Sequence, residues 1–171
     1  MTEDSIQSRP VADSRTAATL LFGALVIGTL DIVYAKVFWH FKARVPPTRI
    51  LQSVAAGIYG KASFTGGART VEIGAALHYL ISLGIVLVFW LGSKRFRALT
   101  ERPVLCGAIY GVLVYFVMNY VVIPLSATQR GKFLISWVAL TIVVHAFLIG
   151  VPAALVSKRA IDLAAQKHPQ N

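Results

Sequence analysis

Residues 104–123 read VLCGAIYGVLVYFVMNYVVI and contain no Asp, Glu, Lys, Arg or His. Roughly 20 mostly apolar residues allow an α-helix to cross about 30 Å of hydrocarbon. The run is continuous, whereas strands of a membrane barrel alternate polar and apolar residues over about ten positions. A helix also satisfies its own backbone hydrogen bonds in lipid. The stretch therefore predicts a transmembrane helix that ends before Pro124.

Three further apolar runs on either side of this stretch have the length of a membrane span. They cover residues 16–39, 71–92 and 133–156. The composition of the whole chain agrees, because 56% of the 171 residues are hydrophobic and only 14% are charged. A soluble domain carries about a quarter charged residues. The sequence thus predicts an all-α protein with a single membrane domain, 16–156, in the form of a four-transmembrane-helix bundle.

The polar ends and loops predict how the bundle lies in the membrane. Four spans place the tails 1–15 and 157–171 on the same side. These tails and the loop between the second and third spans carry slightly more Lys and Arg than the other two loops, and Lys94, Arg95 and Arg97 lie next to a span end. Positive charge favours the cytoplasmic side. We therefore expect both termini in the cytoplasm and a first span that is retained as an uncleaved anchor.

The formal net charge of +10 indicates a negatively charged partner. In a membrane protein this excess favours anionic lipid headgroups. The chain has no helix-turn-helix pattern, zinc-ligand spacing or aromatic RNA-binding motif, so nucleic acid is not expected as a partner.

The first loop is long enough to contain a further helix. Ile50, Leu51, Val54 and Ile58 recur at three- and four-residue spacing over residues 47–60, which indicates one apolar helical face. This segment is too short to span, so we predict an amphipathic helix that is interfacial or re-entrant. It would either cap the bundle or form a lid over a site.

Small residues in the third span predict close helix packing. Gly107 and Gly111 form a GxxxG pair, which lets helix backbones approach closely in lipid. We expect the pair to be used mainly within the chain. A homo-oligomer through the same two glycines is the alternative.

Polar residues inside the apolar runs are the candidate functional groups. Asp31 and His78 lie roughly 10–12 Å deep measured from the side opposite the termini, His145 lies at roughly 18 Å, and Asn119 and Tyr34 lie near them. Ionisable groups at membrane depth usually face the protein interior and often mark ion or proton pathways. These five residues therefore form a candidate ligand- or proton-binding site for ion, proton or small-molecule transport.

Two other interpretations of the same residues remain open. Hydrogen bonds between polar side chains also hold membrane helices together, so the protein could be a structural or accessory membrane protein without transport activity. The two histidines could instead ligate haem in a redox protein, although their different depths argue against it. No catalytic motif identifies an enzyme, no cofactor or metal is indicated, and the one cysteine, Cys106, is read as a core residue.

Several short motifs together resemble a group of uncharacterised bacterial inner-membrane proteins. They are GTLD ending at Asp31, the loop VPPTRILQSVAAG over 45–57, the Gly66–Gly67 pair, Leu77–His78 and VVIPLS ending at Ser126. The early glycine-containing span followed by a Pro-Pro loop is similar to the YagU-like family. The resemblance covers about residues 20–156 and implies a multi-pass protein of the bacterial inner membrane. It implies no activity and no site residues.

Overall fold

The computed structural model describes residues 14–128 and 134–167, and all regular elements in these ranges are helical. Four stretches of helix are long and apolar enough to cross a membrane: Ser14–Ala43, Gly67–Arg95, Pro103–Leu125 and Ile135–Gln166. This confirms the prediction of an all-helical protein with four long apolar helices. The tail residues 1–13 and 168–171, and the predicted start of the fourth span at 133, lie outside the described residues.

The first three long helices extend past both ends expected from hydropathy, and the fourth extends past its expected C-terminal end. The first two are α1 (Ser14–Ala43) and α3 (Gly67–Arg95). The third begins as α5 (Pro103–Val117) and the fourth continues into α8 (Val151–Lys167). Polar residues at the ends of a span can remain helical because the backbone hydrogen bonds continue into the headgroup region.

Two of the long helices contain a π-helical turn just before a proline. The third runs from α5 through η2 (Met118–Val122) into α6 (Ile123–Leu125), and the fourth from α7 (Ile135–Val144) through η3 (His145–Gly150) into α8. The prediction that the third span stops before Pro124 was therefore wrong. Proline lacks an N–H and crowds the carbonyl four residues back. The wider turn accommodates it, because the N–H groups of Ile123 and Val151 bond to carbonyls five residues earlier.

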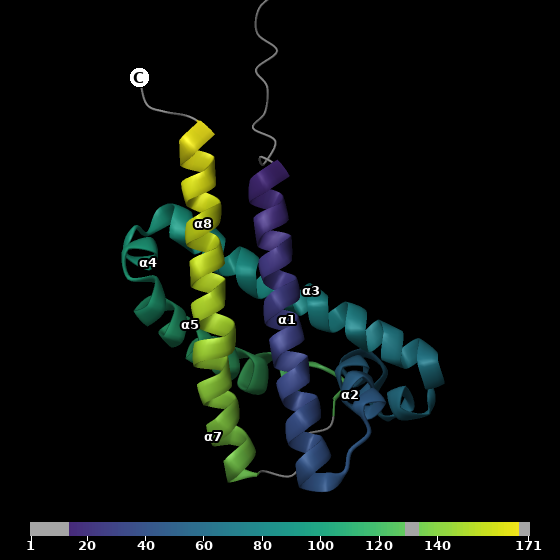
Figure 1. The fold of residues 1–171 in the computed structure, drawn as a ribbon. Helices are drawn as coiled ribbons and strands as arrows, with labels where there is room; N and C mark the ends of the chain where they lie inside the picture. The colour runs from purple at the N-terminus through teal and green to yellow at the C-terminus, as the bar shows by residue number, and fades with distance from the viewer. Residues whose placement is uncertain (1–13, 129–133, 168–171) are drawn as a thin grey trace, which may run out of the picture.

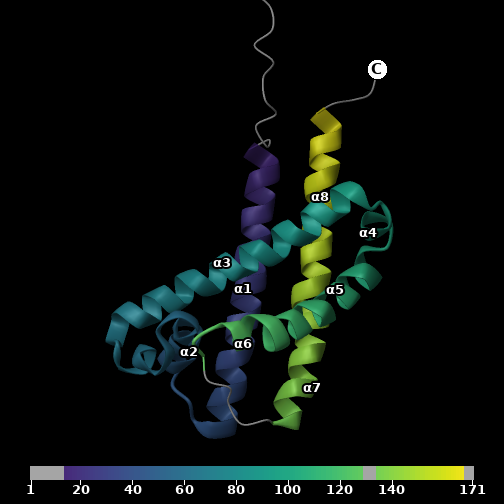
Figure 2. The same cartoon turned by 180° about the vertical axis from the view of Figure 1, so that it is seen from behind.

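The long helices form two crossing layers (Figures 1 and 2). Helix α1 and the α7–α8 helix lie side by side and run in opposite directions, and α3 and α5 cross them obliquely. The start of α1, the end of α8 and the short α4 (Ala98–Glu101) lie toward the same end of the molecule. The core between α1, α3 and α8 contains Leu20, Ala24, Ile27, Val86, Ile149, Ala153 and Ala160.

The GxxxG pair of the third span packs within the chain. A Cβ atom added at Gly107 would come within 2.7 Å of the Gly150 carbonyl oxygen, and one at Gly111 would collide with the carbonyl of His145. The backbones of α5 and η3 therefore approach too closely for larger side chains, which matches the intramolecular use expected. A homo-oligomer through this pair stays a prediction.

The first loop contains α2 (Pro47–Tyr59), followed by the 3-10 helix η1 (Gly60–Thr65). Proline at the first helical position and Gly60 at φ +55° set the two ends of α2. This helix lies directly on α3, because a side chain at Gly74 would collide with the Leu51 carbonyl. Thr70 Oγ1 also donates to the Ser63 carbonyl oxygen at 2.7 Å, which ties η1 to α3.

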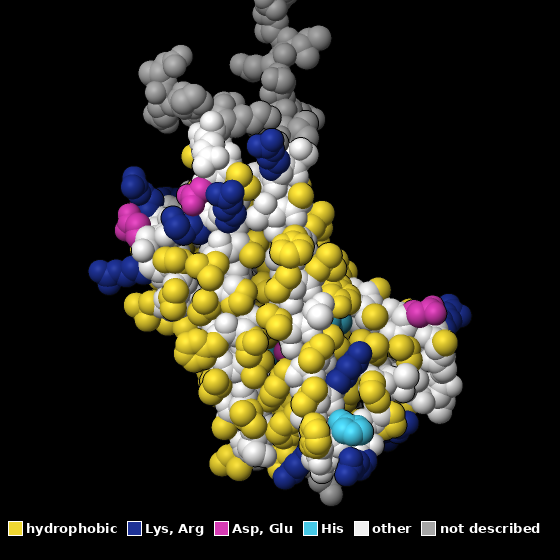
Figure 3. Space-filling view, in the orientation of Figure 1, with side chains coloured by type: hydrophobic (Ala, Val, Ile, Leu, Met, Phe, Trp, Pro, Cys, Tyr) yellow, Lys and Arg dark blue, Asp and Glu magenta, His cyan; other side chains and the backbone are white. Residues whose placement is uncertain are grey.

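The surface divides into an apolar middle and charged ends (Figure 3). Apolar side chains cover the middle of the face shown, and Lys and Arg gather mainly toward its two ends. Large apolar side chains such as Phe22, Leu80 and Ile109 are more than 60% exposed. Contiguous apolar surface of this size is uncommon on soluble monomers. The distribution is compatible with an integral membrane protein.

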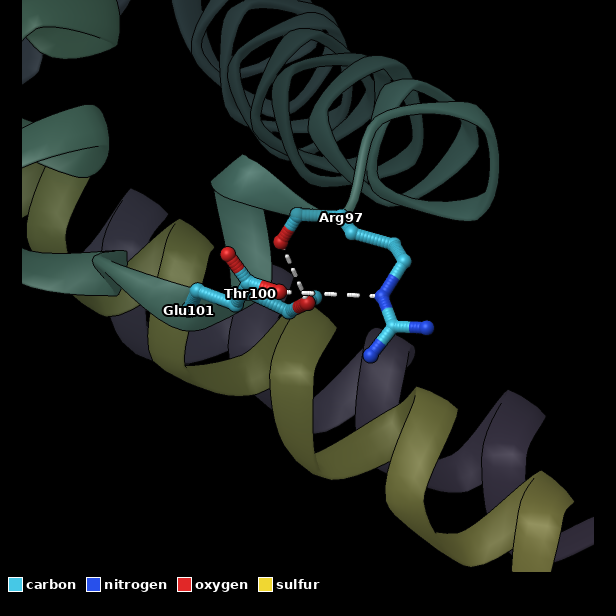
Figure 4. A network of polar contacts seen from close by, with 3 residues as sticks. All are labelled: Arg97, Thr100 and Glu101. Carbon is cyan, nitrogen blue, oxygen red and sulfur yellow. Dashed lines mark hydrogen bonds and ion pairs between the residues drawn. The ribbon is translucent and has the colours of Figure 1, made fainter.

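The charged end near α4 contains a small polar network (Figure 4). Thr100 Oγ1 donates to the Arg97 carbonyl oxygen at 2.8 Å, and Arg97 Nε lies 3.6 Å from Glu101 Oε1. Both charged side chains are well exposed, so the ion pair is screened by water and orders only the local turn.

Candidate functional site

The first polar contact inside the apolar region joins α1 to α3. His78, which is 8% exposed, donates from Nε2 to the Gly28 carbonyl oxygen at 2.7 Å. The two helices are close here, because a Cβ atom at Gly28 would lie 2.8 Å from Ser82 Oγ. Thr29 Oγ1 and the Tyr79 hydroxyl form a second hydrogen bond across the same contact, at 3.1 Å. His78 therefore acts as a clamp between two backbones.

The second polar contact joins α1 to α7 and η3. The Tyr34 hydroxyl and Thr141 Oγ1 are hydrogen-bonded at 3.1 Å. His145 donates from Nδ1 to the Thr141 carbonyl oxygen at 2.9 Å, so Thr141 contacts both residues. Asp31 lies one turn before Tyr34 on α1, and among the described residues it forms no ion pair with His145. We refer to Asp31, Tyr34, Thr141 and His145 as the Asp31–His145 cluster.

Aromatic rings surround this cluster on two sides. Trp137 stacks on Tyr34 with ring centroids 5.3 Å apart and an interplanar angle of 6°. Tyr115 of α5 meets the His145 ring edge-on, at 5.7 Å. His145 is only 9% exposed, so a charge on its ring would interact more strongly with other charges than it would at the surface.

The five residues predicted as one site fall into three places. Asp31, Tyr34 and His145 come together in the cluster. His78 belongs to the separate α1–α3 contact, and no hydrogen bond or ion pair within residues 14–128 and 134–167 links it to Asp31 or His145. Asn119 donates from Nδ2 to the Tyr115 carbonyl oxygen of its own helix, at 2.9 Å. It therefore borders the cluster only through Tyr115.

Two members of the site were missed from the sequence. Thr141 and Trp137 lie in an apolar run, where each reads as an ordinary core or interface residue. The available signal was the four-residue spacing between Thr141 and His145, which places the Thr141 carbonyl within reach of the imidazole in a helix. Tyr34 gave no indication of its partner, because the contact spans 107 positions of sequence.

The chemistry of the cluster depends on the free nitrogen of His145. A neutral imidazole that donates from Nδ1 keeps a lone pair on Nε2. Nε2 has no hydrogen-bond partner among the described residues. The cluster thus combines a carboxylate with an unoccupied imidazole nitrogen, and two such groups can bind a proton or a small cation between them.

The histidines do not fit the haem interpretation. Axial ligation needs a free imidazole nitrogen on each side of the iron. The Nε2 atom of His78 is already bonded to Gly28 on α1, and His145 belongs to a different cluster. In the described part of the chain, no group of three or more His, Cys, Asp or Glu side chains could hold a metal ion.

The cysteine also has a local role. Cys106 is partly buried, and its Sγ lies 3.5 Å from the Ala98 carbonyl oxygen, in the turn that joins α4 to α5.

No family model, curated protein or solved structure matches the chain.

Proposed function

We propose that the protein is a multi-pass protein of a bacterial inner membrane that binds a proton at Asp31 and His145 and carries protons across the membrane through this site. The observation that supports this most directly is the hydrogen bond from His145 Nδ1 to Thr141. It fixes the ring so that the second nitrogen stays free, on the helix that Tyr34 contacts one turn after Asp31. The four long apolar helices support the membrane location, and the sequence resemblance supports its bacterial origin.

In the proposed chemistry, His145 takes up and releases one proton while Asp31 stays a carboxylate. When His145 takes up a proton on Nε2, an imidazolium faces a carboxylate and the charges compensate. When the proton leaves, a carboxylate charge remains in an apolar region, which is unfavourable. The other titratable groups at the cluster are the Tyr34 and Tyr115 hydroxyls, which stay neutral near pH 7. Proton occupancy would therefore change the net charge of the cluster.

The proposed topology has both termini and α4 in the cytoplasm. In this orientation α2 lies at the opposite end of the molecule, as an amphipathic helix at the membrane interface. The Lys and Arg side chains at the two ends would contact anionic lipids.

A matched pair of histidine variants tests the function. The wild-type protein, His145→Gln and His78→Gln are each reconstituted in liposomes containing a pH-sensitive dye, and proton influx is measured under an imposed potential. We expect influx above protein-free liposomes for wild type and for His78→Gln, and background influx for His145→Gln. Wild-type influx at background, or equal influx with His145→Gln, would contradict the proposal.

A structural role without transport is the second candidate. The α1–α3 contact favours it, because the hydrogen bonds of His78 and Thr29 join two helices without any need for a ligand. For a purely structural protein, both histidine variants would lower the melting temperature and no form of the protein would carry protons.

A further inference from the structure

A pocket at the α2 end of the molecule is separate from the Asp31–His145 cluster. Its volume is about 320 Å³, and it lies between the end of α1, α2, η1 and the segment that follows α6. The Ala127 N–H donates to the Gly57 carbonyl oxygen at 3.0 Å, which fastens this last segment to α2. The pocket shares no residue with the cluster.

The charged groups of the pocket have a single sign. Arg49 and Lys61 line it, and no Asp or Glu does. The Arg49 guanidinium lies over the Phe64 ring, 4.8 Å from its centroid, and this contact holds it at the wall. Within the described residues neither cation forms an ion pair. An arginine fork and a lysine ammonium together suit a phosphate group.

The rest of the lining is largely apolar. Its apolar side chains are those of Trp39, Val45, Ile50, Ala56 and Phe64. A hydrated inorganic anion gains little from such walls, whereas the glycerol backbone and first acyl carbons of a lipid can pack on them.

The pocket also lies next to a cluster of aromatic residues at the end of the membrane region. Trp39 packs against Phe38 and Trp137, with ring centroids 5.5 and 5.2 Å apart. Tryptophan and tyrosine are enriched at the membrane–water interface, at the level of the lipid headgroups. The position of the pocket therefore matches the depth of a phospholipid phosphate.

We propose that this pocket binds one anionic phospholipid. Arg49 and Lys61 hold the phosphate, while Trp39 and Phe64 contact the glycerol and upper acyl carbons. A headgroup with a net negative charge, such as that of phosphatidylglycerol, binds better than a zwitterionic headgroup, because its phosphate is not neutralised by an ammonium. This proposal depends on membrane insertion and is independent of proton binding at Asp31 and His145.

The test compares two double variants of the full chain. Arg49→Gln with Lys61→Gln removes both cations of the pocket, and Lys94→Gln with Arg95→Gln removes the same charge from exposed positions at the other end. Each protein in detergent micelles is titrated with phosphatidylglycerol or phosphatidylcholine, and bound lipid is counted by native mass spectrometry. Inorganic phosphate is added as a competitor, and melting temperatures show that each variant is folded.

We expect wild type to retain one phosphatidylglycerol in preference to phosphatidylcholine. The pocket variant should bind it about 30-fold more weakly, since each cation near a membrane surface contributes about 1 kcal/mol. The control variant should bind as wild type does, and phosphate should not compete. Equal loss in both variants, equal binding of the two lipids, or displacement by phosphate would each overturn the proposal. If the pocket variant does not fold, Arg49→Lys with Lys61→Arg replaces it and must retain phosphatidylglycerol.

Discussion

His78 and His145 lie at two different contacts of α1, and they differ in the ring nitrogen that donates a hydrogen bond. At the α1–α3 contact the Nε2–H of His78 bonds to a backbone carbonyl of the neighbouring helix. At the α1–η3 contact His145 bonds from Nδ1 to its own helix, and Nε2 has no hydrogen-bond partner among the described residues. A histidine that donates its hydrogen bond to a neighbouring helix stabilises the packing of the two helices. One whose hydrogen bond stays within its helix keeps a nitrogen available for chemistry.

Replacement of the Asp31 carboxylate should have the largest effect on this comparison. Asp31→Asn keeps the shape of the side chain but removes the negative charge that compensates a protonated His145, so we expect proton influx into liposomes to fall to the protein-free level. Asp162→Asn is the matched control, because Asp162 is exposed and paired with Lys158 on α8. Influx that survives in Asp31→Asn would remove Asp31 from the pathway.

Truncation of the α1–α3 clamp should have the next largest effect, and on stability alone. His78→Ala removes a buried hydrogen bond and leaves a cavity, so we expect the free energy of unfolding to fall by about 2–3 kcal/mol. The measurement is denaturation in detergent, with Leu80→Ala as control because Leu80 is 63% exposed on the same helix. A stable variant that has lost proton influx would reverse the roles given to the two histidines.

Loss of one hydroxyl from the cluster should have a smaller effect. Tyr34→Phe keeps the stacking on Trp137 and removes the bond to Thr141. We expect a loss of about 0.6 kcal/mol of stability, the average for a side-chain hydrogen bond between membrane helices. Tyr120→Phe, at a 65% exposed position, is the control. A loss of several kcal/mol would show that Tyr34 also orders Asp31 and His145.

The smallest effect is expected outside both contacts. Arg97→Gln breaks the exposed pair with Glu101 near α4. Because water and salt screen this pair, the melting temperature should match that of wild type within error. A clear decrease would show that charge at this end contributes to helix packing.

The sequence predicted the long helices well and the rotation of their faces poorly. Uninterrupted apolar runs require helices in lipid, so the four long apolar helices could be derived from residues alone. Counting residues from a common surface brought Asp31 and His78 to one depth and placed His145 roughly 7 Å deeper, yet the structure joins His145 to Tyr34 through Thr141. Depth does not specify the direction of a side chain, however. His78 points at Gly28 because the glycine allows α3 to come close at that point, and this depends on packing between distant segments.

The continuation of the third helix through Pro124 could not be derived for a related reason. A proline after an apolar run is a common stop signal, and the alternative, a wider turn, depends on the wider backbone path being accommodated by neighbouring helices. At η3 that neighbour is α5, whose Gly107 and Gly111 leave room for the backbone of His145 and Gly150.

The wide turn at η3 also determines which side chains of α8 face the interior of the protein. One extra residue in a turn rotates the downstream helix by about 100° relative to an uninterrupted α-helix. Ala153, Ser157 and Ala160 of α8 are fully buried with the turn in place, while His145 upstream of it is buried at the Asp31–His145 cluster. Deletion of a single residue from 146–149 would keep an unbroken, equally apolar helix but turn one of these two faces toward lipid. The fourth helix should therefore tolerate apolar substitutions at the exposed Phe147 and Leu148 and no change in its length.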